Sequence, residues 1–256
     1  LDLTSGRAKM TISITRLLVT PYGQIAPCDF EVSLGVAGYH SAINALAAIG
    51  ATLALGQPIE AIQKGLANYK GVERRFEALY EADFKVFDDH FANGGNIDVT
   101  LESISLMTYK KLILVYAIRG SRGVTTNLEN AQTIVKWAKT LGLEQIIATE
   151  SIGHVGIKDE VTTQERAVFL DTMAQAGIHT LLFTGLKPAI AKGLELIEQG
   201  DVLLLAGCQG MDHGGRIALE LIHHMRPELD REALFKVISE RVCGMNPQPC
   251  EDGVQE

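Results

Sequence analysis

The spacing of hydrophobic positions changes part-way along the chain, and its first part predicts strands followed by helices. Residues 9–18 and 28–34 alternate polar and apolar side chains, which predicts half-buried antiparallel strands. The sequence PYGQ at 21–24, between them, is typical of a turn. Two helices are expected next, because 41–55 is apolar and alanine-rich and 57–69 carries a proline near its start.

Beyond residue 84, short apolar runs alternate with helical segments. The runs KLILVYAI and DVLLLAGC are continuously apolar, as expected for strands buried on both faces. This alternation predicts an α/β fold, a Rossmann-like, mostly parallel sheet with helices on both faces. The expected strands are 84–88, 112–118, 145–149, 179–184 and 202–206. The expected helices are 97–109, 127–141, 163–176, 187–198, 214–225 and 229–240.

Composition narrows the class of protein. With 256 residues, 46% hydrophobic and 21% charged, the chain can bury a substantial core. A net charge of −8 without a basic cluster argues against a nucleic-acid or anionic-membrane partner. We find no membrane-spanning apolar run and no signal peptide at the first residues.

The four cysteines point to a reducing compartment. They form no CxxC pair, so we expect reduced thiols and a cytoplasmic location. Cys243 and Cys250 could pair or bind a metal ion, but no nearby histidine completes a ligand set, and we assign no metal ligand.

The sequence VFDDHFANGG at 86–95 is the centre of the expected site. A predicted strand ends in Asp88 and Asp89, and a polar loop containing Asn93 leads into the next helix. Ligands of open α/β sheets bind at the carboxyl ends of the strands, where this loop lies. The alternative is that these residues only cap the following helix.

Two further candidates lie upstream. His40 and Asn44 are four residues apart at a helix start, so they share a face that suits a flat heterocycle. The alternative is a capping histidine, with the asparagine bonded to backbone. Arg74 and Arg75 are adjacent, and as permanently charged planar donors they suit a phosphate, although a solvated surface pair is the usual alternative.

Glycine-rich loops follow two of the predicted strands, at 118–123 and 206–215. Both lie at strand carboxyl ends, on the same sheet edge as Asp89. Arg119 and Arg122 could hold an anionic group of a substrate there, whereas the glycines could serve tight turns alone. The chain has no GxxxxGK[ST], GxGxxG, HExxH or GxSxG motif, and its histidines suggest neither a triad nor a zinc site.

The order of these segments resembles that of the Mur ligase family, ATP-dependent ligases that join an amine to a carboxylate through an acyl-phosphate. The family's GxHNxxNALAA segment resembles residues 38–48, its GRxE segment 74–77, its DYAHNP segment 89–94 and its GDxxLxAG segment 200–207. Ser41, Arg74, Ala92 and Gly94 differ from the residues typical of these motifs, and the late sequence AGCQGMD differs from AGKGHE.

The resemblance implies binding of ATP with Mg²⁺. It implies that His40 and Asn44 approach the adenine and that Arg75 meets the phosphates, where it would act in catalysis. It implies that Asp89 holds the ribose hydroxyls and that Asn93 lies beside the base.

The same resemblance implies an amine substrate on the two glycine-rich loops, next to Arg119, Ser121, Arg122 and Asp212. It also implies a domain organisation, in which 1–72 end a central ATPase domain, 73–245 form a carboxyl-terminal α/β domain and 246–256 are a tail.

The family's phosphate loop and magnesium-holding carbamylated lysine would lie upstream of residue 1. We therefore expect a fragment that needs its missing ATPase region or a partner chain.

Two alternative functions stay open. One is a Mur-like ligase of nickel-tetrapyrrole biosynthesis that acts on a cofactor carboxylate. The other is a non-catalytic Rossmann-like binding module.

Overall fold

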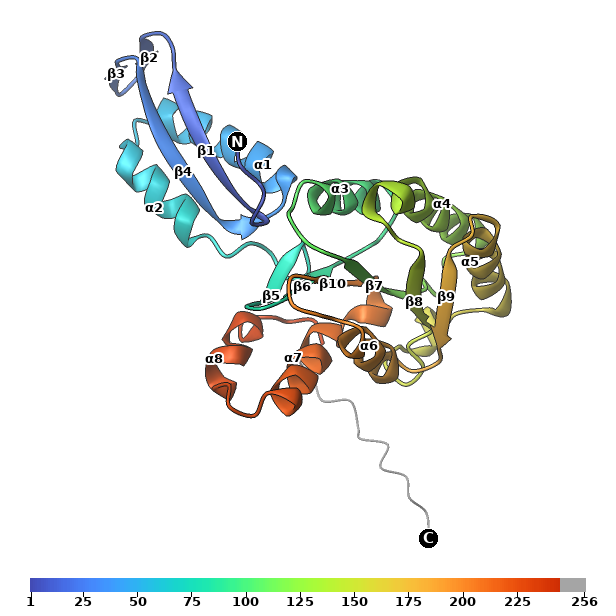
Figure 1. Cartoon of the computed structure of the whole chain (residues 1–256). Coiled ribbons are helices and arrows are strands. Elements are labelled where there is room, and N and C mark those ends of the chain that lie inside the picture. The colour runs from blue at the N-terminus through green and yellow to red at the C-terminus, as the bar shows by residue number, and fades with distance from the viewer. Residues whose placement is uncertain (245–256) are drawn as a thin grey trace. The chain divides into compact units, whose positions relative to one another are not determined.

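Figure 1 shows the computed structural model of the chain, which describes residues 1–244. The chain forms two compact units. The first contains Leu1–Glu77 and Asp98–Thr108, and the second contains Ala78–Ile97 and the described residues from Tyr109 onward. The expected tail at 246–256, Cys250 and residue 245 lie outside the described residues.

The first unit packs two helices on a short antiparallel sheet. Strand β1 pairs with β4, and Ile12 lies opposite Phe30 in the register. Inward residues of both strands, including Met10 and Val32, join Ala45 and Ile49 in one buried cluster. The elements of this unit up to residue 68 are β1 (Arg7–Ile14), β2 (Leu18–Thr20), β3 (Gly23–Ile25), β4 (Cys28–Ala37), α1 (Tyr39–Ala54) and α2 (Ile59–Asn68).

A glycine allows the end of α2 to lie close to β4. A Cβ atom at Gly35 would lie 2.4 Å from the carbonyl oxygen of Tyr69 and 2.5 Å from that of Ala67. Any side chain at this position would therefore displace backbone, and only glycine fits.

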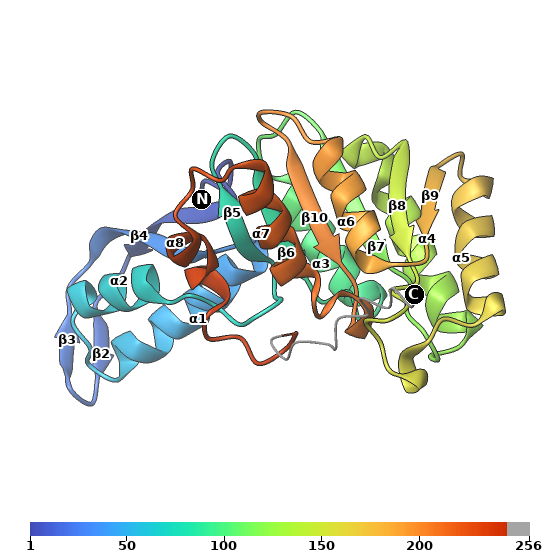
Figure 2. The same ribbon diagram turned by 90° about the horizontal axis from the view of Figure 1, so that it is seen from below.

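The second unit is a six-stranded sheet in the order β5-β6-β10-β7-β8-β9, which can be followed in Figure 2. The pairs β6–β10, β10–β7, β7–β8 and β8–β9 are parallel. Strand β5 reaches β6 through three residues, too short for a parallel crossover. The strands are β5 (Glu77–Glu81), β6 (Lys85–Asp89), β7 (Leu112–Ala117), β8 (Gln145–Thr149), β9 (His179–Phe183) and β10 (Val202–Ala206).

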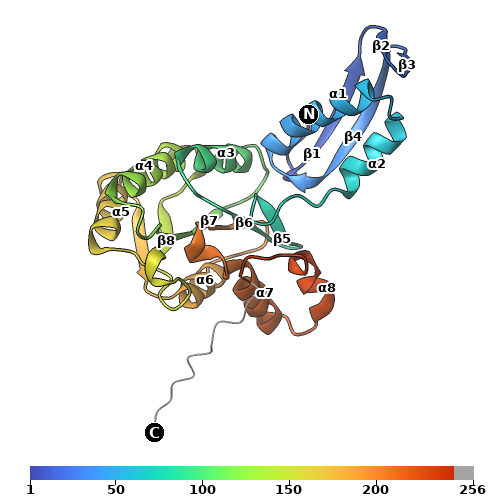
Figure 3. The ribbon, with the colours of Figure 1, turned by 180° about the vertical axis from the view of Figure 1, so that it is seen from behind.

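Helices cover both faces of this sheet (Figures 1 and 3). Helices α4 and α5 lie on one face, and α6 and α7 on the other. Every residue of β7 and β10 is buried, which explains their continuously apolar sequences. The helices are α3 (Gly94–Ser105), α4 (Val124–Leu141), α5 (Thr163–Gln175), α6 (Leu186–Glu195), α7 (Gly214–Met225) and α8 (Arg231–Phe235). The residues of α3 are divided between the two units. Short 3₁₀ turns occupy η1 (Ile157–Asp159), η2 (Gln209–Met211) and η3 (Lys236–Ile238).

The structure confirms the predicted α/β class and mostly parallel sheet, and it corrects several elements. Strand β5 and the hairpin β2–β3 were not predicted, because both are short and lack a regular apolar alternation. Helices α3 and α4 begin three residues earlier than expected. The single helix expected at 229–240 is wrong, since α8 ends at Phe235 and a 3₁₀ turn follows.

No helix among residues 1–244 combines the length and apolarity needed to cross a membrane.

An ion pair ties the hairpin β5–β6 to the end of α7. Arg226 binds Asp83 with both terminal nitrogens, at 2.7 Å and 2.5 Å, and donates to the Tyr80 hydroxyl at 2.8 Å. Its guanidinium also lies over the Phe84 ring, 5.2 Å from the centroid. The bonds from Arg226 lower the pKa of the Asp83 carboxyl and raise the pKa of Arg226.

Arg226→Lys should lower the free energy of unfolding by about 1–2 kcal/mol at neutral pH, because lysine cannot form the two-pronged contact. Since the pKa of Asp83 is lowered on folding, this stabilisation is present above the ordinary aspartate pKa and is lost as pH falls through the lowered value. Urea unfolding at several pH values measures both effects.

Lys192→Gln serves as the control. Lys192 pairs with the exposed Glu195, and loss of such a surface pair should change stability by less than about 0.5 kcal/mol. A difference between wild type and Arg226→Lys that stays constant from neutral to acidic pH would contradict the assignment.

Candidate functional site

The carboxyl ends of β6, β10, β7 and β8 meet at one edge of the sheet. Asp89 pairs with Ala206, Ala206 with Tyr116, and Ala117 with Thr149 at the last positions of these parallel strands. The loops that follow them start from adjacent positions, which places most of the predicted site residues of this unit on one edge.

The two adjacent aspartates of β6 have different surroundings. Asp88 is fully buried, and its Oδ2 lies 2.8 Å from Nη1 of Arg241, which is also buried. A Cβ atom at Gly215 would lie 2.5 Å from that nitrogen, so a glycine admits the arginine. Asp88 therefore holds the segment around Arg241 in place, and its carboxylate, which the sequence analysis expected at the centre of the site, is committed to this ion pair.

Asp89 points to the opposite face of the strand from Asp88, since side chains alternate along a strand. Its side chain is largely buried, at 4% exposed. Its carbonyl oxygen accepts hydrogen bonds from the amides of Gly207 at 3.1 Å and Phe91 at 3.2 Å, which link the ends of β6 and β10.

Asn93 caps helix α3. Its Oδ1 accepts a hydrogen bond from the amide of Asn96 at 3.1 Å. Asn93 therefore caps this helix through its side-chain oxygen, although the helix already begins at Gly94. The side chain is exposed, and its amide nitrogen is not used in the cap.

Arg119 is held through its own backbone by helix α4. The Asn127 side chain accepts from the Arg119 amide at 3.3 Å and donates to the Arg119 carbonyl at 2.8 Å. The Arg119 guanidinium donates through Nη1 to the carbonyl oxygen of Ala92, in the loop after β6. Its buried Nε has no hydrogen-bond partner within residues 1–244. This arginine thus joins two loops of the edge and keeps an unused donor.

Arg122 and Ser121 bond to the segment before α5. Arg122 Nη2 lies 3.0 Å from Oδ1 of Asp159, and Ser121 Oγ donates to the Glu160 carbonyl at 3.1 Å. A Cβ atom at Gly120 would lie 2.0 Å from the Asp159 carbonyl oxygen, so glycine is required for this approach. The side chain of Arg122 is therefore paired with an acid of the same unit.

The carboxylate that binds the backbone of this loop belongs to helix α5, and the sequence analysis did not identify it. Glu165, 1% exposed, accepts from the amides of Ser121 at 3.0 Å and of Arg122 and Gly123 at 2.7 Å each. It also accepts from the Thr162 amide and hydroxyl at 2.9 Å, as the acidic member of a capping box. The pattern Thr162-x-x-Glu165 signals such a cap, but nothing in it reveals the second set of donors.

These bonds change the titration of Glu165. Burial would raise the pKa of this carboxyl, but the backbone donors of Thr162, Gly123 and Ser121 outweigh it and bring the pKa below its ordinary value. The side chain is therefore ionised at neutral pH, and its charge lies at the start of α4 and of α5.

The loop after β10 completes the edge. The Cys208 thiol donates to the Phe91 carbonyl at 3.3 Å, and Asp212 lies half-buried just after η2. The His213 ring meets the His154 ring edge-on, with centroids 5.7 Å apart. Ser151, in the loop just after β8, has φ 55°, and a Cβ atom at Gly210 would lie 3.2 Å from its Oγ. Sequence reasoning had not singled out Ser151.

In the first unit, His40 lies in the first turn of α1. Gly38 precedes that helix with φ 98°, so the capping position belongs to glycine and not to the histidine. His40 Nε2 lies 3.2 Å from Oε2 of Glu102, and the Tyr39 amide donates to Ser103 Oγ at 3.0 Å. The side chain of Asn44 is exposed one turn later.

The two adjacent arginines of the first unit differ in burial. Arg74 is buried, with φ 54°, and its amide donates to Glu77 Oε2 at 2.7 Å. This is the position where the family motif has glycine, a residue that adopts positive φ without strain. Arg75 is exposed, so Arg75 is the arginine of this pair that can reach a ligand.

The predicted site residues fall into two groups. His40, Asn44 and Arg75 belong to the first unit, whereas the others lie around the sheet edge of the second unit, namely Asp89, Asn93, Arg119, Ser121, Arg122 and Asp212. No group of three or more His, Cys, Asp or Glu residues suited to a metal ion occurs within residues 1–244.

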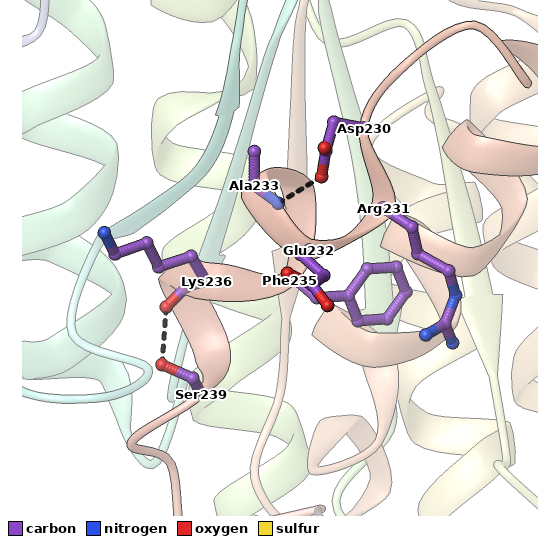
Figure 4. Close-up of a pocket in the computed structure, with 7 residues that line it drawn as sticks. All are labelled: Asp230, Arg231, Glu232, Ala233, Phe235, Lys236 and Ser239. Atoms are coloured by element: carbon purple, nitrogen blue, oxygen red, sulfur yellow. Dashed lines mark hydrogen bonds between the residues drawn. The ribbon is translucent and has the colours of Figure 1, made fainter.

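A hollow of about 630 Å³ around α8 is lined by none of these residues (Figure 4). Asp230 Oδ1 accepts from the Ala233 amide at 2.9 Å, and Ser239 donates to the Lys236 carbonyl at 2.8 Å. These groups serve the local turns, so the hollow adds no candidate chemistry.

Comparison with known families gives a match over residues 74–209, to a family model described as "Mur ligase, glutamate ligase domain". The UDP-N-acetylmuramate--L-alanine ligase of Gloeobacter violaceus is 27% identical over 228 residues, which are 88% of this chain and 46% of that protein. The UDP-N-acetylmuramoyl-L-alanyl-D-glutamate--2,6-diaminopimelate ligase of Alkaliphilus metalliredigens is 28% identical over 200 residues, 76% of this chain and 37% of that protein.

Solved structures show the same fold. MurF from Acinetobacter baumannii aligns with a TM-score of 0.60 and 22% identity, over 87% of this chain and 44% of that one. MurC from Thermotoga maritima aligns with a TM-score of 0.57 and 18% identity, over 85% and 45%. The chain therefore spans less than half the length of these relatives.

Asp88→Asn should lower the free energy of unfolding by about 3–5 kcal/mol, because it leaves the buried Arg241 charge without its carboxylate. Denaturant unfolding of Asp88→Asn, Arg241→Met and the double variant forms a thermodynamic cycle. We expect the double variant to lose clearly less than the sum of the single losses. Additive losses would show that the two charges do not stabilise each other.

Proposed function

Because the chain belongs to the Mur ligase family, we propose that it is the carboxyl-terminal part of an ATP-dependent ligase that joins a carboxylate to an amine. The observation that carries this proposal is the family match over residues 74–209. The matched stretch contains Asp89, the loop 118–123 and the end of β10, which are the parts that form the sheet edge.

The proposed reaction has two steps. The terminal phosphoryl group of ATP passes to an oxygen of the carboxylate substrate, which gives an acyl-phosphate and ADP. The amine nitrogen then attacks the acyl carbon, the bond from that carbon to the phosphate oxygen breaks, and the nitrogen loses a proton. The side chains of this chain bind and orient the reactants and stabilise charge during these steps.

For the nucleotide, we assign His40 and Asn44 to the adenine and Arg75 to the phosphates. The exposure of Asn44 and Arg75 supports this assignment, because both side chains are available to a ligand. An arginine beside the transferred phosphoryl group would offset the charge that develops on its oxygens.

In the second unit, we assign Asp89 to the ribose hydroxyls and Asn93 to the base. Asp89 ends a buried strand at the edge where ligands of such sheets bind, and a carboxylate accepts two hydroxyl donors well. The side-chain oxygen of Asn93 accepts the hydrogen bond that caps α3, so its amide nitrogen is the group that would donate to a base.

We place the amine substrate on the loops 118–123 and 207–214, next to Arg119 and Asp212. Ser121 and Arg122 belong to the same loop, but their side chains are bonded to the Glu160 carbonyl and to Asp159. Their part in substrate binding is therefore indirect.

Mg²⁺ would accompany the ATP phosphates and neutralise their charge. Because the described residues offer no metal-binding cluster, we assign it no ligand in this chain. The relatives are more than twice as long as the part that matches, so we propose that the phosphate loop comes from polypeptide outside these 256 residues, either an ATPase region of the same chain or a partner chain. We also propose a cytoplasmic location.

The two alternatives, a ligase specific for a nickel-tetrapyrrole carboxylate and a non-catalytic binding module, gain no support from the relatives described above, which are ligases of UDP-N-acetylmuramate and its peptides. Neither is needed to explain the fold or the sheet edge.

Asp89→Asn in the full-length protein should weaken ATP binding by about 1–3 kcal/mol, or roughly 5- to 150-fold in Kd, because the ribose hydroxyls lose their charged acceptor. Isothermal titration calorimetry with ATP measures the change.

Asp171→Asn is the matched control, since Asp171 is an exposed carboxylate on α5. An Asp89→Asn protein that is folded and binds ATP as tightly as wild type would refute the ribose assignment.

A further inference from the structure

The loop 121–123 has the geometry of an anion site whose occupant is a side chain of the same chain. Three successive amides, of Ser121, Arg122 and Gly123, converge on the carboxylate of Glu165. Ser121 and Gly123 have φ 52° and 88°, the alternation that turns neighbouring amides toward a common point. A substrate anion cannot use these donors while Glu165 fills the position.

The same carboxylate fixes the start of helix α4. Gly123 precedes that helix and has no side chain with which to cap it. The negative charge that stabilises the helix start therefore comes from Glu165. Asn127, in the first turn, is fully buried and bonds to both the amide and the carbonyl of Arg119. Asn127 Nδ2 also donates to the Gly123 carbonyl at 3.2 Å, so a continuous path of hydrogen bonds runs from Glu165 through the start of α4 to Arg119.

The path ends at the loop after β6. Arg119 donates to the Ala92 carbonyl, and Ala92 precedes Asn93 in the loop that we assign to the nucleotide. The side chain of Arg122 takes no part in this path, because its guanidinium binds Asp159 and the residue is exposed. Arg119 and Arg122, the two arginines of the loop 118–123, thus make different contacts.

We infer that Glu165 is a positioning residue that presents Arg119, and not Arg122, to an anionic group of the amine substrate. This inference rests on the proposed function for the substrate, whereas the hydrogen-bond path stands on the structure alone. Glu165 keeps the loop's backbone donors occupied, so the substrate's anion meets the guanidinium of Arg119, whose Nε has no partner within residues 1–244.

Hydrogen exchange of the full-length protein, followed by mass spectrometry, tests the path without any substrate. Glu165→Ala should speed exchange about tenfold in peptides covering 118–127, since the amides lose a charged acceptor. It should also speed exchange in peptides covering 90–97, because Arg119 loses its fixed position. Glu160→Ala is the matched control, because the side chain of Glu160 is exposed and its backbone carbonyl, which the substitution keeps, is the group that binds Ser121.

Acetate distinguishes positioning from a general loss of stability. Glu165→Ala leaves a space beside three amides, so acetate should occupy it and restore protection at 118–127 and at 90–97, whereas sodium chloride at equal ionic strength should not. Arg122→Ala should loosen 118–127 and leave 90–97 unchanged. Exchange at 90–97 that does not respond to Glu165→Ala, or protection that acetate does not restore, would overturn the positioning role.

Kinetics of the full-length enzyme test the link to substrate. With an α-amino acid as the amine, Glu165→Ala should raise KM for that amino acid about tenfold and change kcat less than about twofold, and acetate should reverse the rise. An unchanged KM alongside the expected exchange result would overturn the substrate part of the inference alone. Absence of ATP-dependent amide formation in wild type would overturn the proposed function, and the exchange result would still decide the path.

Discussion

Burial of strand β10 between the parallel strands β6 and β7 is the constraint on which the second unit depends. All five residues of β10 are buried, and each pairs with a neighbour on both sides. Because these three strands run in the same direction, their carboxyl ends lie side by side. The loops at 90–93, 118–123 and 207–213 must therefore start from adjacent positions, although they are far apart in the sequence.

Charges then fix those loops in place. The buried pair of Asp88 and Arg241 attaches the segment near residue 241 to the end of β6, and Glu165 attaches the loop 121–123 to the start of α5. In each case the positive charge or the N–H donors that face the carboxylate offset the cost of burying it. Some residues that look like candidate ligand groups in the sequence, such as Asp88, thus have structural roles.

The sequence was sufficient to predict the sheet and the strands whose carboxyl ends form one edge of it. Continuously apolar runs identify β7 and β10, and the motif around Asp89 places acids at a strand end. It was not sufficient to predict β5, whose five residues have no regular apolar pattern, or the break after α8.

Contacts between distant residues were beyond sequence reasoning. Nothing in the chain near Asp88 indicates Arg241, which follows 153 positions later, and nothing near Ser121 indicates Glu165. The difference between Arg74 and Arg75 likewise comes from backbone geometry, since Arg74 has φ 54° and a buried side chain. Local patterns identify the segments, whereas tertiary packing decides which side chain of each segment is available.

The most direct measurement is a crystal structure of the full-length protein with ADP. If the chain is the carboxyl-terminal part of an ATP-dependent ligase, the ribose hydroxyls should lie within hydrogen-bonding distance of the Asp89 carboxylate, and Asn93 should lie beside the base. ADP bound without contact to any residue of this chain would contradict the assignment of its sheet edge to nucleotide binding.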